Sequence, residues 1–189
     1  MVTQPKLILF CGPSGSGKTT LVQHLLGDIP SLCFSISATT RQKRDGEVHG
    51  KDYYFLSTEE FKQKIENDEF VEWEEVYQSG FYGTLKSEIE RIGKLNMTPI
   101  FDVDVEGGLS FKKLYGPAIL TVFVRPPSIQ QLKQRLKKRA TETPESLEKR
   151  IAKSEKELTY AEQFDKVITN DKLEDAFKEA RETVRSFLV

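Results

Sequence analysis

A glycine-rich stretch close to the first residues of the sequence has the residue types and spacing that bind phosphate. Gly12 to Thr19 match the pattern G-x-x-x-x-G-K-[ST] in full, after the apolar run Leu7–Cys11 and before a helical pattern. In this setting backbone N–H groups converge on phosphate oxygens, and the dipole of the following helix strengthens the attraction. We expect Lys18 to bridge the β- and γ-phosphates of a nucleoside triphosphate and the Thr19 hydroxyl to reach Mg²⁺. The predicted triphosphate-binding residues are Gly12, Pro13, Ser14, Gly15, Ser16, Gly17, Lys18, Thr19 and Thr20.

An acidic residue that ends a later strand is a candidate partner for the same metal ion. Asp102 closes the apolar run that begins at Ile100. A carboxylate at this place can hold Mg²⁺ directly or through a water molecule. Aspartate also ends many strands that bind no metal, so the position alone leaves both interpretations open.

A polar loop after the run Cys33–Ile36 suggests a second anion site. Arg41 and Arg44 are three residues apart, and Tyr53 follows them. Guanidinium groups bind phosphate in a bidentate manner, and a tyrosine hydroxyl can add a hydrogen bond. An anion bound there would lie beyond the tip of a core strand, where open α/β sheets bind ligands. A solvated charged loop would explain the same residues, so the cluster by itself does not decide.

The elements that must position these residues alternate between strands and helices. Helical patterns between most of the strands are typical of a mostly parallel sheet with helices on both faces. The expected fold class is therefore α/β, with a three-layer P-loop core. Apolar, β-branched or aromatic runs predict strands at Leu7–Cys11, Cys33–Ile36, Ile100–Val103, Ile119–Val124 and Val167–Thr169.

Several helix starts carry capping signals. A serine followed three residues later by Glu or Gln forms a capping box, and proline is favoured at the first helical position. These signals occur at Ser57 with Glu60, Ser128 with Gln131, Thr143 with Pro144, and Asp171 with Glu174, where we expect the last helix to begin.

Two segments interrupt the alternation of strands and helices. Residues 37–88 are polar and aromatic and predict a small mixed insertion, whereas residues 126–158 predict a charged helix–turn–helix. The core is then expected at 1–36, 89–125 and 159–189. No repeat or linker predicts a second independent domain.

The helix–turn–helix segment carries a dense basic run. Lys133 to Arg139 hold five cations and no acid, and Arg150 follows on the next helix. A mobile segment of this kind can bring arginines to a transferring phosphoryl group when both substrates are bound. A solvated helix face explains some of these cations equally well. A nucleic-acid patch is disfavoured, since no aromatic residues interleave the run.

Composition limits the classes of function. The formal net charge is −1, so nothing global attracts the chain to nucleic acid or to anionic lipid. No apolar run approaches the length of a membrane span, and the N-terminal residues do not resemble a signal peptide. Two cysteines, Cys11 and Cys33, are too few for a disulfide framework and predict buried free thiols in a reducing cytoplasm. We therefore expect a cytoplasmic protein, either a monomer or a small homo-oligomer.

Further motifs occur in order along the chain. They are Ser-Ile-Ser-Ala-Thr-Thr-Arg at 35–41, the run from Arg44 to Tyr53, Phe-Val-Glu-Trp at 70–73, Phe-Tyr-Gly-Thr at 81–84 and Asp-Val-Asp at 102–104. Together with the P-loop, they make the chain resemble the guanylate kinase family over nearly its whole length. The set is specific, since generic P-loop proteins share only the first motif. The resemblance implies ATP-dependent phosphorylation of GMP to GDP, with Mg²⁺ as cofactor.

The resemblance also implies roles for the matched positions. Arg41, Arg44, Tyr53 and Tyr82 would hold the GMP phosphate, whereas Ser37, Glu72 and Thr84 would read the guanine with Asp104 close by. Segment 126–158 would be the lid, and Asn170 would touch the adenine of ATP, although a strand-ending asparagine is usually a turn residue. The residues expected to act in catalysis are Lys18, Arg41, Arg135, Arg139 and Arg150.

The chemistry of guanine agrees with the role implied for Glu72. Guanine presents N1–H and an exocyclic amine as adjacent donors, and one carboxylate accepts both. Adenine lacks this pair and would leave the carboxylate unpaired, at a cost of about 1–3 kcal/mol. Glu74 and Glu75 follow on the same strand, and strand alternation alone does not choose among the three acids. Only the resemblance selects Glu72, and the ordinary expectation for the other two is a solvated strand face.

Three other functions are less consistent with the sequence than a GMP kinase. A scaffold-type interaction module is disfavoured by the intact Gly17-Lys18-Thr19 and Asp102. A GTPase switch is disfavoured because Asp104 to Gly107 fit D-x-x-G but no N-K-x-D motif accompanies them. A kinase for a phosphorylated sugar would keep the P-loop but should lack the base pocket of Glu72 and Thr84.

Overall fold

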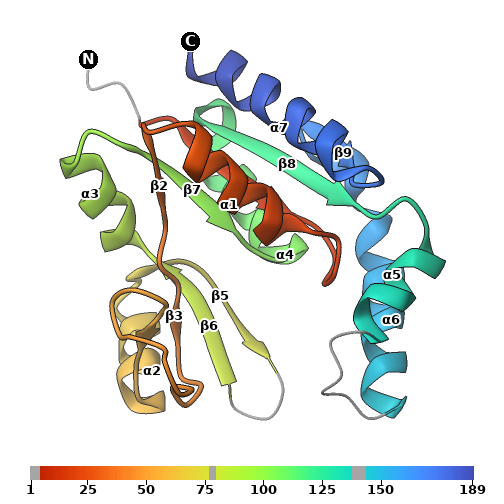
Figure 1. Cartoon of the computed structure of the whole chain (residues 1–189). Helices are drawn as coiled ribbons and strands as arrows, with labels where there is room; N and C mark the ends of the chain where they lie inside the picture. Colours follow the sequence, from red (N-terminus) through yellow and green to blue (C-terminus); the bar gives the residue numbers. More distant parts are fainter. Residues whose placement is uncertain (1–4, 77–79, 138–143) are drawn as a thin grey trace.

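A computed structural model describes residues 5–76, 80–137 and 144–189 of the chain. Its centre is a five-stranded, wholly parallel sheet with the strand order β2-β7-β1-β8-β9 (Figure 1). The expected α/β fold with a mostly parallel central sheet is confirmed. The strands are β1 (Leu7–Cys11), β2 (Leu32–Phe34), β7 (Thr98–Asp102), β8 (Ile119–Arg125) and β9 (Lys166–Thr169).

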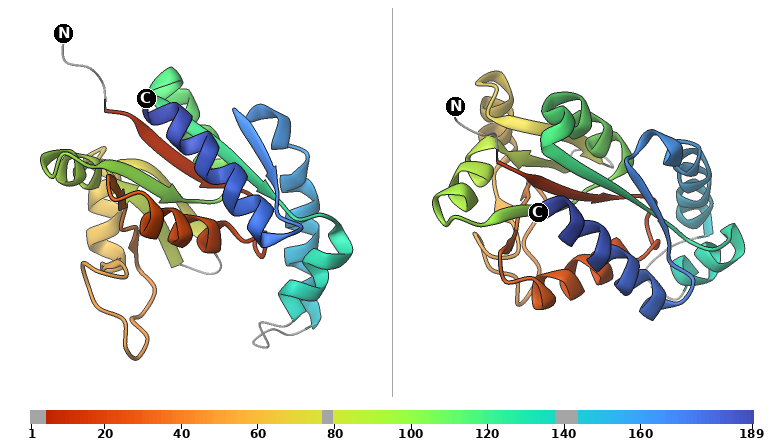
Figure 2. Two further views of the ribbon diagram at one scale, coloured as in Figure 1. Left: turned by 45° about the horizontal axis from the view of Figure 1, so that its top comes forward. Right: turned by 90° about the horizontal axis from the view of Figure 1, so that it is seen from above.

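Helices cover both faces of this sheet, because alternate residues of β1 face opposite sides and all of them are buried. Ile8 and Phe10 pack with α1 (Lys18–Asp28) and α7 (Leu173–Leu188). Leu7 and Leu9 pack in a second cluster with α3 (Lys86–Lys94) and α4 (Val105–Tyr115). The two views in Figure 2 show the resulting three layers, with α1 and α7 on the same side of the sheet.

A second, smaller sheet lies within the predicted insertion. It has the order β4-β3-β6-β5, and its strands pair in both parallel and antiparallel directions. Phe61 of α2 (Thr58–Glu66) packs against Phe70 and Phe81 and gives this sheet its own apolar cluster. The strands are β3 (Ala38–Thr39), β4 (Tyr54–Phe55), β5 (Phe70–Val76) and β6 (Gly80–Leu85).

The charged segment after β8 forms α5 (Ile129–Lys137) and α6 (Pro144–Leu158). In Figure 1 the second sheet lies below the core and follows the end of β2, whereas α5 and α6 lie at the right, past the end of β8. Short 3-10 turns at Gly116–Ala118 and Ala161–Gln163 complete the elements. No helix in the described ranges is long and apolar enough to cross a membrane.

Local details confirm some expected boundaries and correct others. Ser57 and Glu60 form the predicted capping box, and Ser128 accepts a hydrogen bond from the N–H of Gln131 at 3.2 Å. The last helix begins at Leu173, not at Asp171. The strand predicted at Cys33–Ile36 ends at Phe34, because the N–H of Ile36 turns away to the carboxylate of Glu88 at 2.6 Å. Cys11 is buried as expected, but Cys33 is only partly buried.

Candidate functional site

The P-loop lies between β1 and α1 and takes a conformation that only glycine allows at two points. Gly12 has φ 136°, and a Cβ atom there would lie 2.3 Å from the carbonyl oxygen of Val124. Gly17 caps α1 with φ 101°, and its Cβ would lie 2.1 Å from the amide of Asn170. L-residues rarely adopt such φ values, and the space is already filled by backbone at Gly12 and by the Asn170 side chain at Gly17. The loop therefore wraps closely at the N-terminus of α1, where N–H groups and the helix dipole favour an anion.

Two side chains of the P-loop motif are already turned toward this loop and the neighbouring strand. The Lys18 ammonium donates to the carbonyls of Gly12 at 2.7 Å and Pro13 at 3.2 Å. The Thr19 hydroxyl donates to the carboxylate of Asp102 at 2.5 Å. β1 and β7 are paired neighbours, which is why residues so distant in sequence meet at one sheet edge.

The P-loop is braced from two sides by residues far along the chain. The buried side chain of Asn170 donates to the carbonyl of Ser16 at 2.8 Å, and Arg135 donates to the same carbonyl at 3.4 Å and to that of Asn170 at 3.0 Å. Arg150 of α6 donates to the Ser14 hydroxyl. The amide of Asn170 thus holds the loop, and the contact with adenine that the resemblance implies stays a prediction.

The loop between β3 and β4 of the second sheet carries Arg41 and Arg44 and is folded around an ion pair between Arg41 and Glu47. Arg41 donates to both carboxylate oxygens of Glu47, at 2.8 and 2.9 Å, and lies 5.2 Å from the ring centre of Tyr53. Hydrogen bonds from Arg41 and from the N–H of Arg44 lower the pKa of Glu47 to about 2. Tyr53 and Tyr82 meet edge to face at 6.2 Å. The loop therefore presents one oriented guanidinium beside two phenol rings, while the Arg44 side chain is exposed.

Glu72 and Thr84 form a buried polar pair across β5 and β6. They are directly paired in the sheet register, and the Thr84 hydroxyl donates to Glu72 Oε1 at 2.7 Å. Burial raises the pKa of Glu72 to about 7, with the hydrogen bond from Thr84 opposing the rise and the charge of Asp104 adding to it. A buried carboxylate of this kind is strongly disfavoured without donors, so a ligand that offers two N–H groups would stabilise its charged form.

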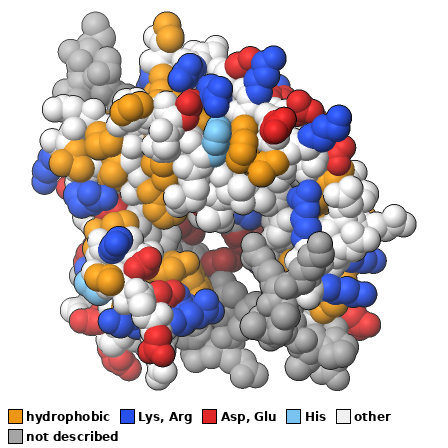
Figure 3. Space-filling view, viewed as in Figure 1, with side chains coloured by type: hydrophobic (Ala, Val, Ile, Leu, Met, Phe, Trp, Pro, Cys, Tyr) orange, Lys and Arg blue, Asp and Glu red, His pale blue; other side chains and the backbone are white. Residues whose placement is uncertain are grey.

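One cavity of about 550 Å³ brings the two regions together. The P-loop contributes Gly12, Ser14 and Lys18, and the second sheet contributes Ser37, Tyr53, Glu72, Glu74, Tyr82 and Gly83. Asp102, Val103 and Asp104 follow β7, and Arg150, Lys153, Ser154 and Glu157 come from α6. The space-filling view shows the hollow between the second sheet and the α5–α6 arm, with acidic side chains at its back (Figure 3).

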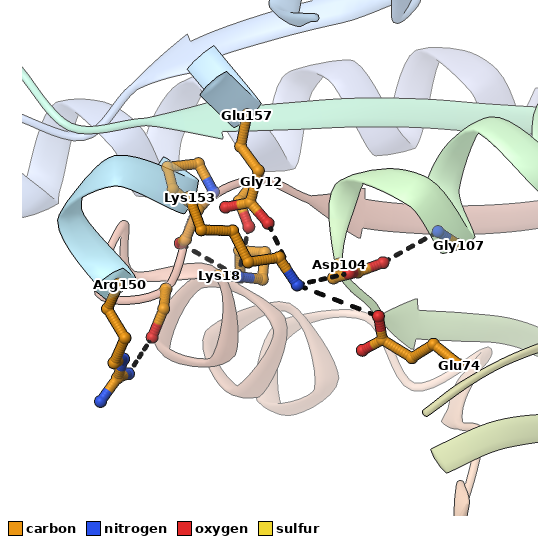
Figure 4. Close-up of polar contacts among 10 residues, drawn as sticks. Gly12, Lys18, Glu74, Asp104, Gly107, Arg150, Lys153 and Glu157 are labelled. Carbon is orange, nitrogen blue, oxygen red and sulfur yellow. Dashed lines mark hydrogen bonds and ion pairs between the residues drawn. The ribbon is translucent and has the colours of Figure 1, made fainter. Parts of the chain in front are cut away.

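The back of this cavity holds a compact cluster of charges (Figure 4). The Lys153 ammonium lies 3.3 Å from Asp104, 3.7 Å from Glu157 and 3.9 Å from Glu74. Burial and a hydrogen bond with Asp104 raise the pKa of Glu74 to about 8. Asp104 itself caps α4 by accepting from the N–H of Gly107 at 2.9 Å. Burial opposes ionisation of Asp104, but the hydrogen bonds from Glu74 and Gly107 and the charge of Lys153 outweigh it and lower its pKa.

Some of the sequence-predicted residues line the cavity and others do not. Lining the cavity are Gly12, Ser14, Lys18, Ser37, Tyr53, Glu72, Tyr82, Asp102, Asp104 and Arg150. The lining does not include Pro13, Gly15, Ser16, Gly17, Thr19, Thr20, Arg41, Thr84, Arg135 or Asn170. Arg44 is exposed on its loop, and Arg139 lies outside the described residues.

Sequence reasoning missed several residues of the cavity wall. Glu74, expected on a solvated strand face, faces the cavity, as strand alternation from Glu72 could have indicated. Lys153 and Glu157 were missed, although they follow Arg150 at three- and seven-residue spacings that place them on one helix face. Gly107 was noted only for a GTPase motif, yet a Cβ atom there would lie 3.2 Å from Glu72 Oε2.

Comparisons with known proteins decide the family. A family model described as guanylate kinase matches residues 4–187. The chain belongs to the guanylate kinase family. A curated guanylate kinase of Bacteroides fragilis is 50% identical to it over 98% of this chain and 91% of the relative. One of Porphyromonas gingivalis is also 50% identical, over 97% of this chain and 98% of the relative. The family consists of nucleoside monophosphate kinases, so the chain is an enzyme of that class.

Solved structures place the fold among P-loop kinases. A guanylate kinase from Anaplasma phagocytophilum superimposes with a TM-score of 0.75 at 27% identity, covering 96% of this chain and 85% of that one. A shikimate kinase from Bacteroides thetaiotaomicron gives a TM-score of 0.52 at 15% identity, covering 97% and 98%, and shares the fold alone.

The donor set near the P-loop fits the Mg²⁺ that a nucleotide kinase uses. Mg²⁺ prefers oxygen ligands, keeps several waters, and binds one or two protein groups together with substrate phosphates. The Thr19 hydroxyl and the Asp102 carboxylate are adjacent oxygen donors of this kind. Within the described ranges no group of three or more His, Cys, Asp or Glu side chains could hold a metal by itself.

Proposed function

We propose that the protein transfers the γ-phosphoryl group of ATP to GMP and releases ADP and GDP. The proposal rests mainly on one observation: a single cavity is lined both by the P-loop residues Gly12, Ser14 and Lys18 and by the acceptor-side residues Glu72 and Tyr82. Two anionic substrates bound to these two walls would face each other. Such an arrangement permits direct in-line transfer of a phosphoryl group between them.

On the donor side, the backbone of the P-loop and the Lys18 ammonium would bind the β- and γ-phosphates. Lys18 is held at the mouth of the loop by carbonyl oxygens, from which it can turn to a phosphate. Thr19 and Asp102 would hold Mg²⁺, directly or through water, and the metal would neutralise charge on the phosphates. Arg150, which reaches the P-loop from α6, would contribute positive charge from the opposite wall.

On the acceptor side, Arg41, Tyr53 and Tyr82 would bind the GMP phosphate with Arg44, and Glu72, Thr84 and Ser37 would read guanine. The nucleophile is a phosphate oxygen, which needs little deprotonation near neutral pH, so we expect no essential general base. Catalysis would come from positioning and from charge neutralisation. The groups assigned to the acceptor address its base and phosphate, so we also propose dGMP as an acceptor. A place in cytoplasmic purine nucleotide metabolism follows from these substrates.

A coupled assay of ADP release with Mg-ATP tests the proposal. The acceptors are GMP, dGMP, AMP, CMP and a sugar phosphate, and the matched variant is Glu72→Gln, which keeps the size of the side chain. We expect GMP to be the best acceptor, and Glu72→Gln to lower its advantage over AMP by about 10–100-fold, the cost of one poorly paired buried polar group. Faster turnover of AMP, CMP or the sugar phosphate would overturn the base assignment. ADP release without any acceptor would indicate a hydrolase, and no turnover with any acceptor would favour an interaction module.

A further inference from the structure

Helix α6 contacts two separate parts of the cavity wall through residues one turn apart. Arg150 reaches the Ser14 hydroxyl of the P-loop. Lys153 reaches Asp104 at 3.3 Å, after β7, and Glu74 at 3.9 Å, on β5. Residues three apart lie on the same helix face, so one surface of α6 spans from the donor side to the acceptor side. Figure 4 shows both side chains extending from this helix, Lys153 toward the acids and Arg150 toward the loop.

Glu74 is placed by the strand to act with the base-reading residues. It lies two positions after Glu72 on β5, so both side chains project to the same face of the sheet. It is paired in register with Tyr82, as Glu72 is paired with Thr84. Both acids line the cavity, and Glu74 is also hydrogen bonded to Asp104.

The resulting wall carries a concentration of carboxylates where an anionic substrate must bind. Glu72, Glu74, Asp104 and Glu157 all line the same cavity. Wherever these groups are ionised, they disfavour one another's charge and would repel a phosphate. Among the ion pairs of the described residues, Lys153 is the cation that contacts Asp104, Glu74 and Glu157. Partial burial disfavours its charge, but the three carboxylates outweigh this effect and raise the pKa of Lys153.

Lys153 differs from the other cations of the cavity in what it contacts. Lys18 donates to P-loop carbonyls, and Arg150 contacts the P-loop serine. Asp104 is the charged neighbour that opposes ionisation of Glu72, so a cation held against Asp104 favours the charged form of the base reader. The position of α6 is therefore linked to the acceptor site through one ammonium group.

We propose that Lys153 is a further positioning residue of the GMP site: from α6 it holds Asp104 and Glu74 in place and thereby supports Glu72 in binding guanine. The proposal rests on the proposed function, since it concerns the same acceptor. It assigns to α6 two tasks, of which Arg150 serves the donor and Lys153 serves the acceptor. GMP binding and the seating of α6 on the cavity must then favour each other reciprocally.

The test compares Lys153→Met, Lys153→Arg, Glu74→Gln and the Lys153→Met/Glu74→Gln double variant. Lys156→Met is the matched control, since Lys156 is an exposed lysine on the same helix. GMP affinity is measured by calorimetry without ATP, and initial rates give KM for GMP and for ATP. We expect Lys153→Met to weaken GMP binding at least about fivefold, the lower end of typical coupling between sites, with KM for ATP changed less than about twofold. Lys153→Arg should restore most of the affinity, and Lys156→Met should match wild type.

The double variant separates positioning from simple structural support. Glu74→Gln replaces a carboxyl group that Lys153 contacts with an amide of the same shape, so Lys153→Met should cost less in that background than in wild type. Additive effects, an equal rise in both KM values, or equal effects of Lys153→Met and Lys156→Met would overturn the inference. Should Lys153→Met fail to fold, Lys153→Gln takes its place with the same expectations. A wild-type protein that does not bind GMP overturns the proposed function, whereas wild-type binding that Lys153→Met leaves unchanged overturns this inference alone.

Discussion

The two walls of the cavity are assembled in different ways. The donor wall is a single stretch, Gly12 to Thr19, whose conformation follows from glycines, a preceding strand and a following helix. The acceptor wall combines β5 and β6 with the end of β7 and one face of α6. A contiguous site depends mainly on its own residues, whereas a dispersed site depends on the elements that hold its parts together. A substitution in the donor wall should therefore remove a group that acts directly on the substrate. A substitution in the acceptor wall should instead displace the residues that bind the substrate.

The largest effect is expected at the donor wall, from Lys18→Met. Loss of the ammonium should lower kcat by about 10²–10³-fold, as for removal of one transition-state donor, while the melting temperature stays near that of wild type. Calorimetric affinity for GMP without ATP should change little, because Lys18 contacts the P-loop carbonyls and not the acceptor residues. A variant that keeps more than about a tenth of the wild-type kcat would contradict the role of Lys18.

A residue behind the acceptor wall should matter for stability instead. The buried carboxylate of Glu88 accepts from the N–H of Ile36 at 2.6 Å and the hydroxyl of Tyr54 at 3.1 Å, and it pairs with Arg91. Glu88→Ala leaves these donors without their acceptor and should lower the free energy of unfolding by about 3 kcal/mol. Urea denaturation measures the loss. Glu88→Gln, which keeps an acceptor oxygen, should lose less, and equal losses would show that hydrogen bonding at this site is unimportant.

The pH dependence of GMP binding should follow the ionisation of the Glu72 carboxyl group. The pKa of Glu72 is about 7, and the ionised form is the one that accepts the two N–H groups of guanine. Affinity for GMP should therefore rise as the pH increases through 7, by about tenfold between pH 6 and pH 8, the change in the ionised fraction of such a group. KM for GMP measured across this range tests the slope. The GMP phosphate titrates as well, so the contribution of Glu72 is the difference between the pH slopes of wild type and Glu72→Gln. Identical slopes in both proteins would exclude Glu72.

The smallest effect is expected from Gly107→Ala in the first turn of α4. The added methyl group would lie 3.2 Å from Glu72 Oε2 and 3.4 Å from Asp104 Oδ1. Displacing the Glu72 carboxylate should raise KM for GMP about three- to fivefold, near the low end of overpacking costs, with KM for ATP unchanged. Gly93→Ala is the matched control, because a Cβ atom on that helical glycine has no neighbour within 4 Å. A similar response of both variants would remove Gly107 from the acceptor wall.

The sequence alone determined the position of the P-loop and the fold class. The motif from Gly12 to Thr19, the strand before it and the helix after it are local features, and apolar runs separated by helical patterns predict a parallel sheet. The motifs shared with guanylate kinases also indicated the family. Local chemistry sufficed here because neighbouring residues create the structure they use.

Only the tertiary structure decided which distant side chains meet. It brought Thr19 to Asp102, turned Asn170 to the P-loop, paired Arg41 with Glu47 and placed Lys153 among three acids. Residue type does not reveal these contacts, because strand register and the direction in which a helix face points are set by packing of the whole chain. Glu74 is an intermediate case, because strand alternation places it on the same face of β5 as Glu72 but does not show that this face lines a cavity.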